Sequence, residues 1–252
     1  MTTPAAPDVL FDRQGPVATI TLCRPEVLNA QTPQMWTALR EFGRQLPGDV
    51  RVVVVRAQGR AFSSGIDLSV VKRTFAEMTS YSDDEVANRI AFFQEAFSWL
   101  RRPDLVSIAA VQGHAIGAGF QLALACDLRV VTDDAKFTMA EVTLGLVPDL
   151  TGTKRLVDLV GYGRALEICV TGRRVDAPEA YRIGLANVVV PGDELDRAVD
   201  DLAAAVLSAN RDAVVEIKAL LSGAGERDYP AQEAAEREAQ VRRIRDLAGQ
   251  GE

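Results

Sequence analysis

Residues 107–131 read SIAAVQGHAIGAGFQLALACDLRVV, and their pattern indicates the fold class. Short apolar runs at 107–111 and 128–131 are typical of buried β-strands. A glycine-rich turn and the apolar helical stretch 122–126 lie between them. A strand, a helix and a second strand in this order are typical of a parallel unit whose strands are covered on both faces. The segment therefore predicts an α/β protein.

The flanking sequence repeats this pattern. Residues 17–22 (VATITL) and 52–55 (VVVV) predict two more strands. Between them, Thr32 followed by Pro33 predicts a helix start, with threonine as the N-cap and proline in the first turn. After about residue 155 the only strand signal is VVVP at 188–191. Further helices are predicted near 84–101, 164–170, 194–207, 212–220 and 231–247. We predict a core over residues 1–195 and a helical C-terminal region over 196–252.

Composition excludes several classes of function. The chain has 252 residues and a formal net charge of −7, with 48% hydrophobic and 25% charged residues. This is a globular composition, and its acidic balance argues against a nucleic-acid partner. No uninterrupted apolar stretch is long enough to span a membrane, and the first residues carry no export signal, so we expect a cytoplasmic protein without a membrane partner. Three scattered cysteines argue against a disulfide framework. With His114 as the only histidine, a two-histidine metal site is impossible.

Two turns that contain glycines are candidate parts of an active site. Residues 59–68 read GRAFSSGIDL and residues 113–119 read GHAIGAG, each after a predicted strand. Small residues let a ligand approach the main chain, and a turn that enters a helix leaves its first N–H groups unpaired. Two such donors on one oxygen would form an oxyanion hole, which an enolate needs. The alternative is that both are simply tight turns between a strand and a helix.

These turns and two further motifs, in this order, resemble the crotonase superfamily, the enoyl-CoA hydratase/isomerase family. The further motifs are LCRPEVLNA at 22–30 and FTMAEVTLGLVPDLTGTKRL at 137–156, and the second turn extends to GHAIGAGFQLALACD at 113–127. The resemblance covers roughly residues 8–225. It implies a spiral of ββα units with a helical C-terminal region that forms trimers or dimers of trimers. It also implies an acyl-CoA thioester as ligand and stabilisation of its enolate.

The resemblance also implies roles for individual residues. The N–H groups of Ile66 and Ala118 would form the oxyanion hole. Glu141 would be the acid or base, and Asp149 a second one, since dienoyl-CoA isomerases of the family place an aspartate there. Gln121 stands where hydratases carry their first glutamate and where the dienoyl-CoA isomerases also carry an acidic residue, so the chain departs from both patterns at this position. A glutamine can orient water but cannot exchange a proton at neutral pH. Further substrate or CoA contacts are expected at Arg24, Ser64, Gly65, Asp67, Leu68 and Gly117.

We therefore expect an enzyme that hydrates or isomerises an enoyl- or dienoyl-CoA, with no metal and no cofactor other than the CoA of its substrate. The acyl pocket is expected on loops between about residues 68 and 100. Asp67 is also expected to cap the following helix.

Two alternatives to this function stay open. One is a catalytically silent acyl-CoA-binding homologue that has lost the first glutamate. The other is a serine hydrolase that uses Ser63 or Ser64 with His114.

Overall fold

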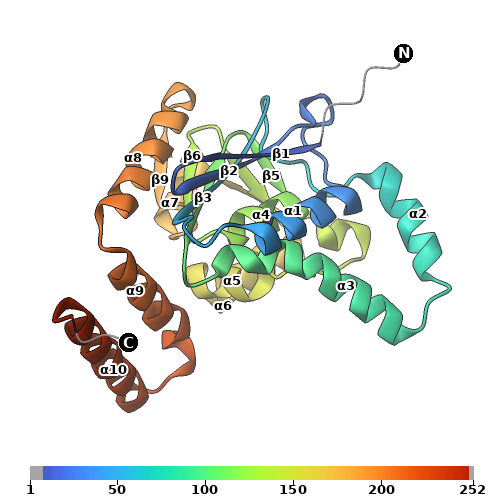
Figure 1. Cartoon of the computed structure of the whole chain (residues 1–252). Helices are drawn as coiled ribbons and strands as arrows, with labels where there is room; N and C mark the ends of the chain where they lie inside the picture. Colours follow the sequence, from blue (N-terminus) through green and yellow to red (C-terminus); the bar gives the residue numbers. More distant parts are fainter. Residues whose placement is uncertain (1–7, 250–252) are drawn as a thin grey trace.

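A six-stranded sheet forms the centre of the protein. The computed structural model describes residues 8–249, except for the side chains of residues 73 and 75 (Figure 1). The sheet order is β1-β2-β3-β4-β6-β9, and only the β1–β2 pair is antiparallel. The strand bounds are β1 Val9–Gln14, β2 Val17–Leu22, β3 Val52–Ala57, β4 Val106–Val111, β6 Leu128–Thr132 and β9 Val188–Val190. The five strands predicted from β-branched and apolar runs are confirmed, and β1 was missed.

A smaller sheet of three short strands, β5 (His114–Ile116), β7 (Lys136–Thr138) and β8 (Arg174–Asp176), lies beside the first. Each of these strands has three residues, which is too short for an alternating pattern to be detected. The middle strand β7 pairs in parallel with β5 and antiparallel with β8. Because β5 leads directly into helix α4 (Ala118–Ala125), this sheet fixes the entry of the chain into that helix.

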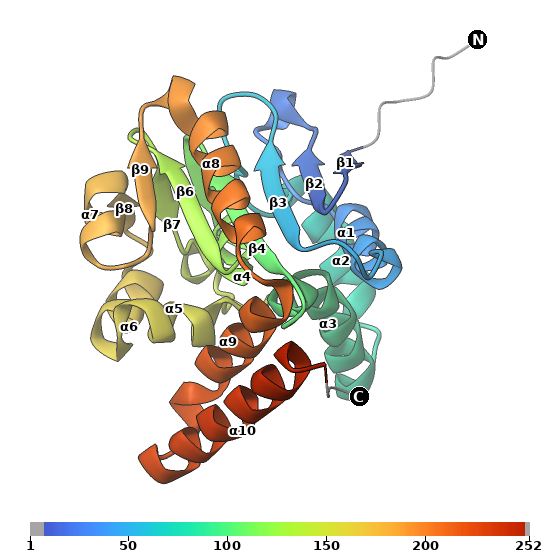
Figure 2. The ribbon, with the colours of Figure 1, turned by 60° about the vertical axis from the view of Figure 1, so that its left-hand side comes forward.

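Helices cover both faces of the large sheet, which explains the uninterrupted valines of β3. On one face, Val53 and Val55 belong to the main core, into which α1 (Pro33–Gln45) and α3 (Asp83–Ser98) pack. On the other face, Val52 and Val54 pack with α8 (Leu195–Ser208). Figure 2 shows α8 lying across the sheet. Successive strand residues point to opposite faces, so a strand covered on both sides is apolar throughout.

The predicted helices are confirmed, with small shifts at their ends. Thr32 is the N-cap of α1, because its side chain accepts a hydrogen bond from the Met35 N–H. The remaining α-helices are α2 Leu68–Met78, α5 Gly152–Val160, α6 Tyr162–Thr171, α7 Ala177–Arg182, α9 Arg211–Gly223 and α10 Tyr229–Leu247. The expectation of loops between residues 68 and 100 was wrong, since α2 and α3 occupy most of that stretch. None of the helices described is long and apolar enough to cross a membrane.

The C-terminal helices differ in their contacts. Helix α8 packs on the sheet, whereas α9 and α10 pack mainly against each other and extend away from it (Figure 2). One attachment of α9 is Lys218, whose ammonium donates to Asp127 Oδ2 at 2.6 Å and to the Leu105 carbonyl at 2.7 Å. The division of the chain at residues 195 and 196 stays a prediction.

Candidate active site

The two glycine-punctuated turns lie against each other. The Ser63 N–H donates to the His114 carbonyl at 2.9 Å, and the Ile116 N–H donates to the Ser63 carbonyl at 3.0 Å. These bonds form an isolated parallel bridge between Ser63 and Ala115. The bridge fixes the ends of the two turns relative to each other, so that Ile66 on the first turn and Ala118 on the second line the same cavity.

The main-chain N–H groups of Ile66 and Ala118 are free to bind a ligand. Neither N–H has a hydrogen-bond acceptor among the described residues. Ala118 is the first residue of α4, where N–H groups lack an intrahelical partner and the helix dipole favours negative charge. Gly65 has φ +93°, and a Cβ there would lie 2.7 Å from the Ile116 carbonyl oxygen. Glycine is therefore required for the two turns to approach this closely.

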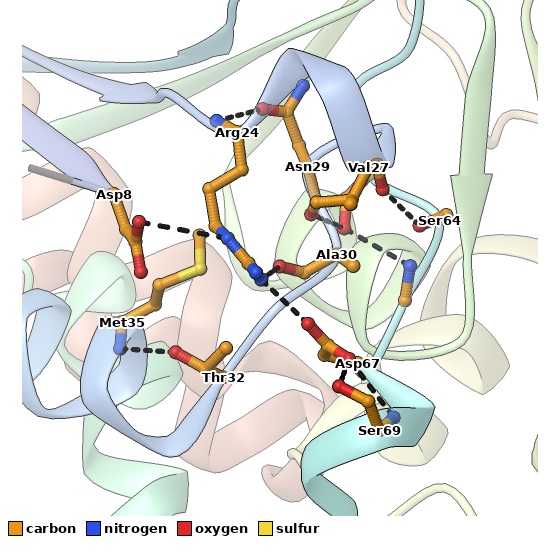
Figure 3. Close-up of polar contacts among 12 residues, drawn as sticks. Asp8, Arg24, Val27, Asn29, Ala30, Thr32, Met35, Ser64, Asp67 and Ser69 are labelled. Atoms are coloured by element: carbon orange, nitrogen blue, oxygen red, sulfur yellow. Dashed lines mark hydrogen bonds and ion pairs between the residues drawn. The ribbon is translucent and has the colours of Figure 1, made fainter. Parts of the chain in front are cut away.

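Polar side chains beside the first turn contact one another, as Figure 3 shows. Arg24 Nη1 donates to the Ala30 carbonyl at 2.6 Å and to Asp67 Oδ2 at 3.0 Å. Asp67 Oδ1 accepts from the N–H and the hydroxyl of Ser69, which confirms Asp67 as the cap of α2. The hydrogen bond from Ser69 and then the one from Arg24 lower the pKa of Asp67. This ionised pair anchors the segment that presents the Ile66 N–H.

The substrate-contacting residues expected from the sequence fall into two groups. Ser64, Gly65, Leu68 and Gly117 line the cavity, whereas Arg24 and Asp67 lie outside its lining and contact each other. The cavity has a volume of about 630 Å³. Helices α1, α2 and α3 build its apolar wall from Trp36, Val71, Met78, Val86, Ile90 and Phe93. All of these except Trp36 lie in the stretch 68–100 where the acyl pocket is expected, but on helices in place of loops. Helical spacing had marked Ile90 and Phe93 only as core residues.

Two carboxyl groups face this cavity. Glu141 begins the 3₁₀ turn η3 (Glu141–Leu144), and Asp149 follows this turn before α5. Burial raises the pKa of Glu141, and the nearby Asp149 adds to the rise, while the hydrogen bond from Gln121 opposes it. Burial also raises the pKa of Asp149. Carboxyl groups whose pKa is raised in an apolar cleft can hold and release protons closer to neutral pH.

Gln121 is in direct contact with the glutamate. Its Nε2 donates to Glu141 Oε1 at 2.7 Å, and its Oε1 accepts from the N–H groups of Leu150 at 2.8 Å and Gly152 at 3.2 Å. The residue is only 1% exposed. Glu141 Oε2 is buried and has no hydrogen-bond partner among the described residues.

The serine and the histidine of the hydrolase alternative do not pair. Ser63 is fully buried, and its hydroxyl donates to the Asn29 carbonyl at 2.8 Å and accepts from Gln31 Nε2 at 3.1 Å. The hydroxyl of Ser64 donates to the Val27 carbonyl. No hydrogen bond between a serine hydroxyl and the His114 ring occurs within residues 8–249, and His114 is not among the cavity-lining residues. The described geometry therefore gives this alternative no support.

Several known proteins that resemble this chain are named as enoyl-CoA hydratases. The family model described as enoyl-CoA hydratase/isomerase matches residues 12–248. A Thermobifida fusca protein described as "a putative enoyl-CoA hydratase", solved with acetoacetyl-CoA, is 47% identical with a TM-score of 0.91, covering 95% of each chain. The same protein solved with CoA gives a TM-score of 0.89, covering 96% of this chain and 95% of that one.

Curated relatives agree with the structural match. The Mycobacterium tuberculosis protein named "Probable enoyl-CoA hydratase echA8" is 34% identical over 189 residues, which cover 74% of this chain and 70% of that protein. The "Short-chain-enoyl-CoA hydratase" of Clostridium acetobutylicum is 32% identical over 204 residues, covering 80% and 76%. With the paired turns and the two cavity carboxyls already in place, these matches show that the chain belongs to the enoyl-CoA hydratase/isomerase family of enzymes.

Proposed function

We propose that this enzyme moves a double bond in an enoyl- or dienoyl-CoA, with Glu141 and Asp149 as its acid and base. The observation that carries the proposal is one apolar cavity that brings together two unpaired N–H donors and two carboxyl groups of raised pKa. The Thermobifida fusca protein solved with CoA and with acetoacetyl-CoA supports an acyl-CoA ligand.

In the proposed reaction, the thioester oxygen accepts hydrogen bonds from the N–H groups of Ile66 and Ala118. Ionised Glu141 removes a proton from the carbon next to the thioester, and the electron pair of that C–H bond moves onto the thioester oxygen as an enolate. The enolate then reforms its carbonyl, the double bonds shift along the chain, and protonated Asp149 gives its proton to the far carbon. Each oxyanion-hole donor contributes about 2.7–4 kcal/mol to stabilising such a transition state.

Hydration is the second reaction open to this family. Gln121 argues against hydration by two glutamates, and Asp149, which stands where dienoyl-CoA isomerases of the family place an aspartate, favours isomerisation. A glutamine side chain cannot take up or release a proton at neutral pH. Its amide group is already bound to Glu141, Leu150 and Gly152. We therefore propose isomerisation as the principal activity, with no metal and with CoA entering only as part of the substrate. A catalytically silent acyl-CoA-binding protein is the alternative that the same substitution supports.

An ultraviolet assay distinguishes these functions. The protein is incubated with a 2-enoyl-CoA and, separately, a 3,5-dienoyl-CoA, and the change in absorbance follows conjugation being lost or gained. We expect turnover of the dienoyl-CoA, and loss of about 100-fold or more in kcat in both Glu141→Gln and Asp149→Asn. Full turnover of the dienoyl-CoA by Asp149→Asn would exclude the isomerase mechanism. Binding of both thioesters without turnover would establish the silent protein.

We also propose that the protein assembles as a trimer or a dimer of trimers through its C-terminal helices. Ala239 is the only buried residue among the 19 of α10, all of which are described. Helices α9 and α10 together expose several large apolar side chains, namely Ile217, Leu221, Tyr229, Val241, Ile244 and Leu247. A patch of this kind is typical of a protein–protein interface.

A further inference from the structure

The orientation of the Gln121 side-chain amide is dictated by its neighbours. Two main-chain N–H groups, of Leu150 and Gly152, point at one end of the amide, so this end must be the oxygen. The other end lies 2.7 Å from Glu141 Oε1 and must be the NH₂ group. A reversed amide would set N–H groups against N–H groups and an oxygen against a carboxylate oxygen. The amide therefore has one stable orientation.

The surroundings also prevent Gln121 from moving. The side chain is 1% exposed, and a Cβ at Gly152 would lie 2.7 Å from its Cγ. On the far side of the pair, the Glu141 carboxyl group packs over Gly117, where a Cβ would lie 3.3 Å from Oε1. The glutamate is thus held between the turn that leads into α4 and the amide of a residue within α4.

We propose that Gln121 is a positioning residue that joins the two proton-transfer groups into one unit. Its NH₂ group orients the Glu141 carboxyl group and favours its ionised form. Its oxygen ties down the main chain at Leu150 and Gly152, directly after Asp149. This inference rests on the proposed acid–base role of Glu141 and Asp149. It assigns Gln121 contacts with protein groups in place of contacts with water or substrate.

A carboxylate at position 121 would change the chemistry. The Leu150 and Gly152 N–H groups could still bind one of its oxygens, so the main chain would stay in place. Its other oxygen would take the position of Nε2, within hydrogen-bond distance of Glu141 Oε1. Two carboxyl groups this close cannot both be ionised, and they share a proton with a strongly raised apparent pKa. Glu141 would then stay protonated at pH values at which it acts as a base in the native enzyme.

The test compares Gln121→Glu, Gln121→Leu and a matched control, Gln45→Glu. Gln45 is exposed at the end of α1 and has no side-chain hydrogen bond among the described residues. The pH dependence of kcat is measured on the dienoyl-CoA. We expect Gln121→Glu to shift the acidic limb of this profile to higher pH. We expect Gln121→Leu to lower kcat by about 10- to 100-fold, as misplacement of a reacting group by about 1 Å does, with a small effect on KM. Gln45→Glu should behave as wild type.

A second measurement does not depend on turnover. The pKa of Glu141 is followed by NMR in protein labelled with ¹³C at the glutamate carboxyl carbon, and Glu141→Gln identifies the resonance. We expect the pKa to rise in Gln121→Leu, which loses the N–H donor, and to rise further in Gln121→Glu. The swapped variant Gln121→Glu/Glu141→Gln again pairs an amide with a carboxylate, so it reports whether the site still folds.

The outcomes separate this inference from the proposed function. An unchanged pH profile and an unchanged Glu141 pKa in Gln121→Leu would overturn the positioning role, even if Glu141→Gln is inactive. Turnover by Glu141→Gln at the wild-type rate would overturn the proposed function instead. An acidic limb that stays at its wild-type position in Gln121→Glu would also overturn the inference, because a second carboxyl group beside Glu141 must raise the apparent pKa of the pair.

Discussion

At the residue scale, the buried carboxyl group of Glu141 lowers the stability of the folded protein at neutral pH. Its folded-state pKa lies above the unfolded value because burial disfavours the charged form. Protonated Glu141 therefore contributes its full stabilisation of the fold at pH values below the pKa of the unfolded state. This contribution is lost as the pH rises through the pKa of the folded state. We expect Glu141→Gln, whose oxygen can still accept from Gln121, to be more stable than wild type at neutral pH. The difference should vanish below about pH 4, near the ordinary glutamate pKa.

Thermal unfolding over this pH range checks the prediction. Glu26→Gln serves as the control, because Glu26 is exposed and forms no side-chain hydrogen bond or ion pair within the described residues. Its unfolding temperature should stay close to that of wild type at each pH. A Glu141→Gln protein that is less stable than wild type at neutral pH would mean that the ionised carboxyl group is favourably solvated in the fold.

A second prediction at this scale concerns Gly65. Gly65→Ala introduces a Cβ next to the Ile116 carbonyl at a residue with φ +93°. We expect a loss of about 100-fold or more in kcat, because the Ile66 N–H group moves away from the position in which it donates to the thioester oxygen. Gly15→Ala is the matched control, since Gly15 has φ +57° and no atom lies within 4 Å of the position that a Cβ would take. Both should lose about 1–2 kcal/mol to backbone strain. Equal activity in the two variants would exclude the Ile66 N–H from the oxyanion hole.

At the scale of elements, strands with β-branched runs and helices with clear caps could be predicted from the sequence. Thr32 and Pro33 marked the start of α1, and the valines of β3 marked a strand covered on both faces. The pattern did not predict β5, β7 and β8, because three residues carry no periodicity. Helix α2 was missed, and its apolar residues Leu68 and Val71 line the cavity, with Leu68 54% exposed and outside the core.

The attachment of α9 leads to a prediction at the same scale. Lys218 and Asp127 form an ion pair that is largely buried, and Ser107 supplies two further hydrogen bonds to the same Asp127 oxygen. Removal of one member leaves a buried charge, so Lys218→Met should lower the free energy of unfolding by about 3 kcal/mol. Hydrogen exchange in α9 and α10 should quicken. Arg197→Met removes the exposed pair with Glu194 and should change stability by less than about 1 kcal/mol. Equal losses would mean that Lys218 contributes no more than a surface pair.

At the scale of the whole molecule, the residues of the candidate site could be predicted from the sequence. The contacts that hold these residues in place could not. Motif order identified Glu141, Asp149 and the two turns, which the fold brings to one cavity. The spacing of residues along the chain carries no information on which atoms an amide meets. The contacts of Gln121 with Leu150 and Gly152, about 30 positions away, therefore had to come from the structure. The same holds for the pairing of Arg24 with Asp67.

The exposed apolar side chains of the C-terminal helices carry the last prediction. Leu221 on α9 and Ile244 on α10 are 71% and 56% exposed, and a monomer would leave both in water. If copies of the chain associate through these helices, Leu221→Asp/Ile244→Asp places charges in the interface, and burial of an unpaired charge strongly opposes association. Sedimentation velocity should then show a trimer or hexamer for wild type and a monomer for the variant. Leu10→Asp, on the edge strand β1, is the control and should keep the wild-type assembly. Wild-type sedimentation as a monomer would contradict the proposed assembly.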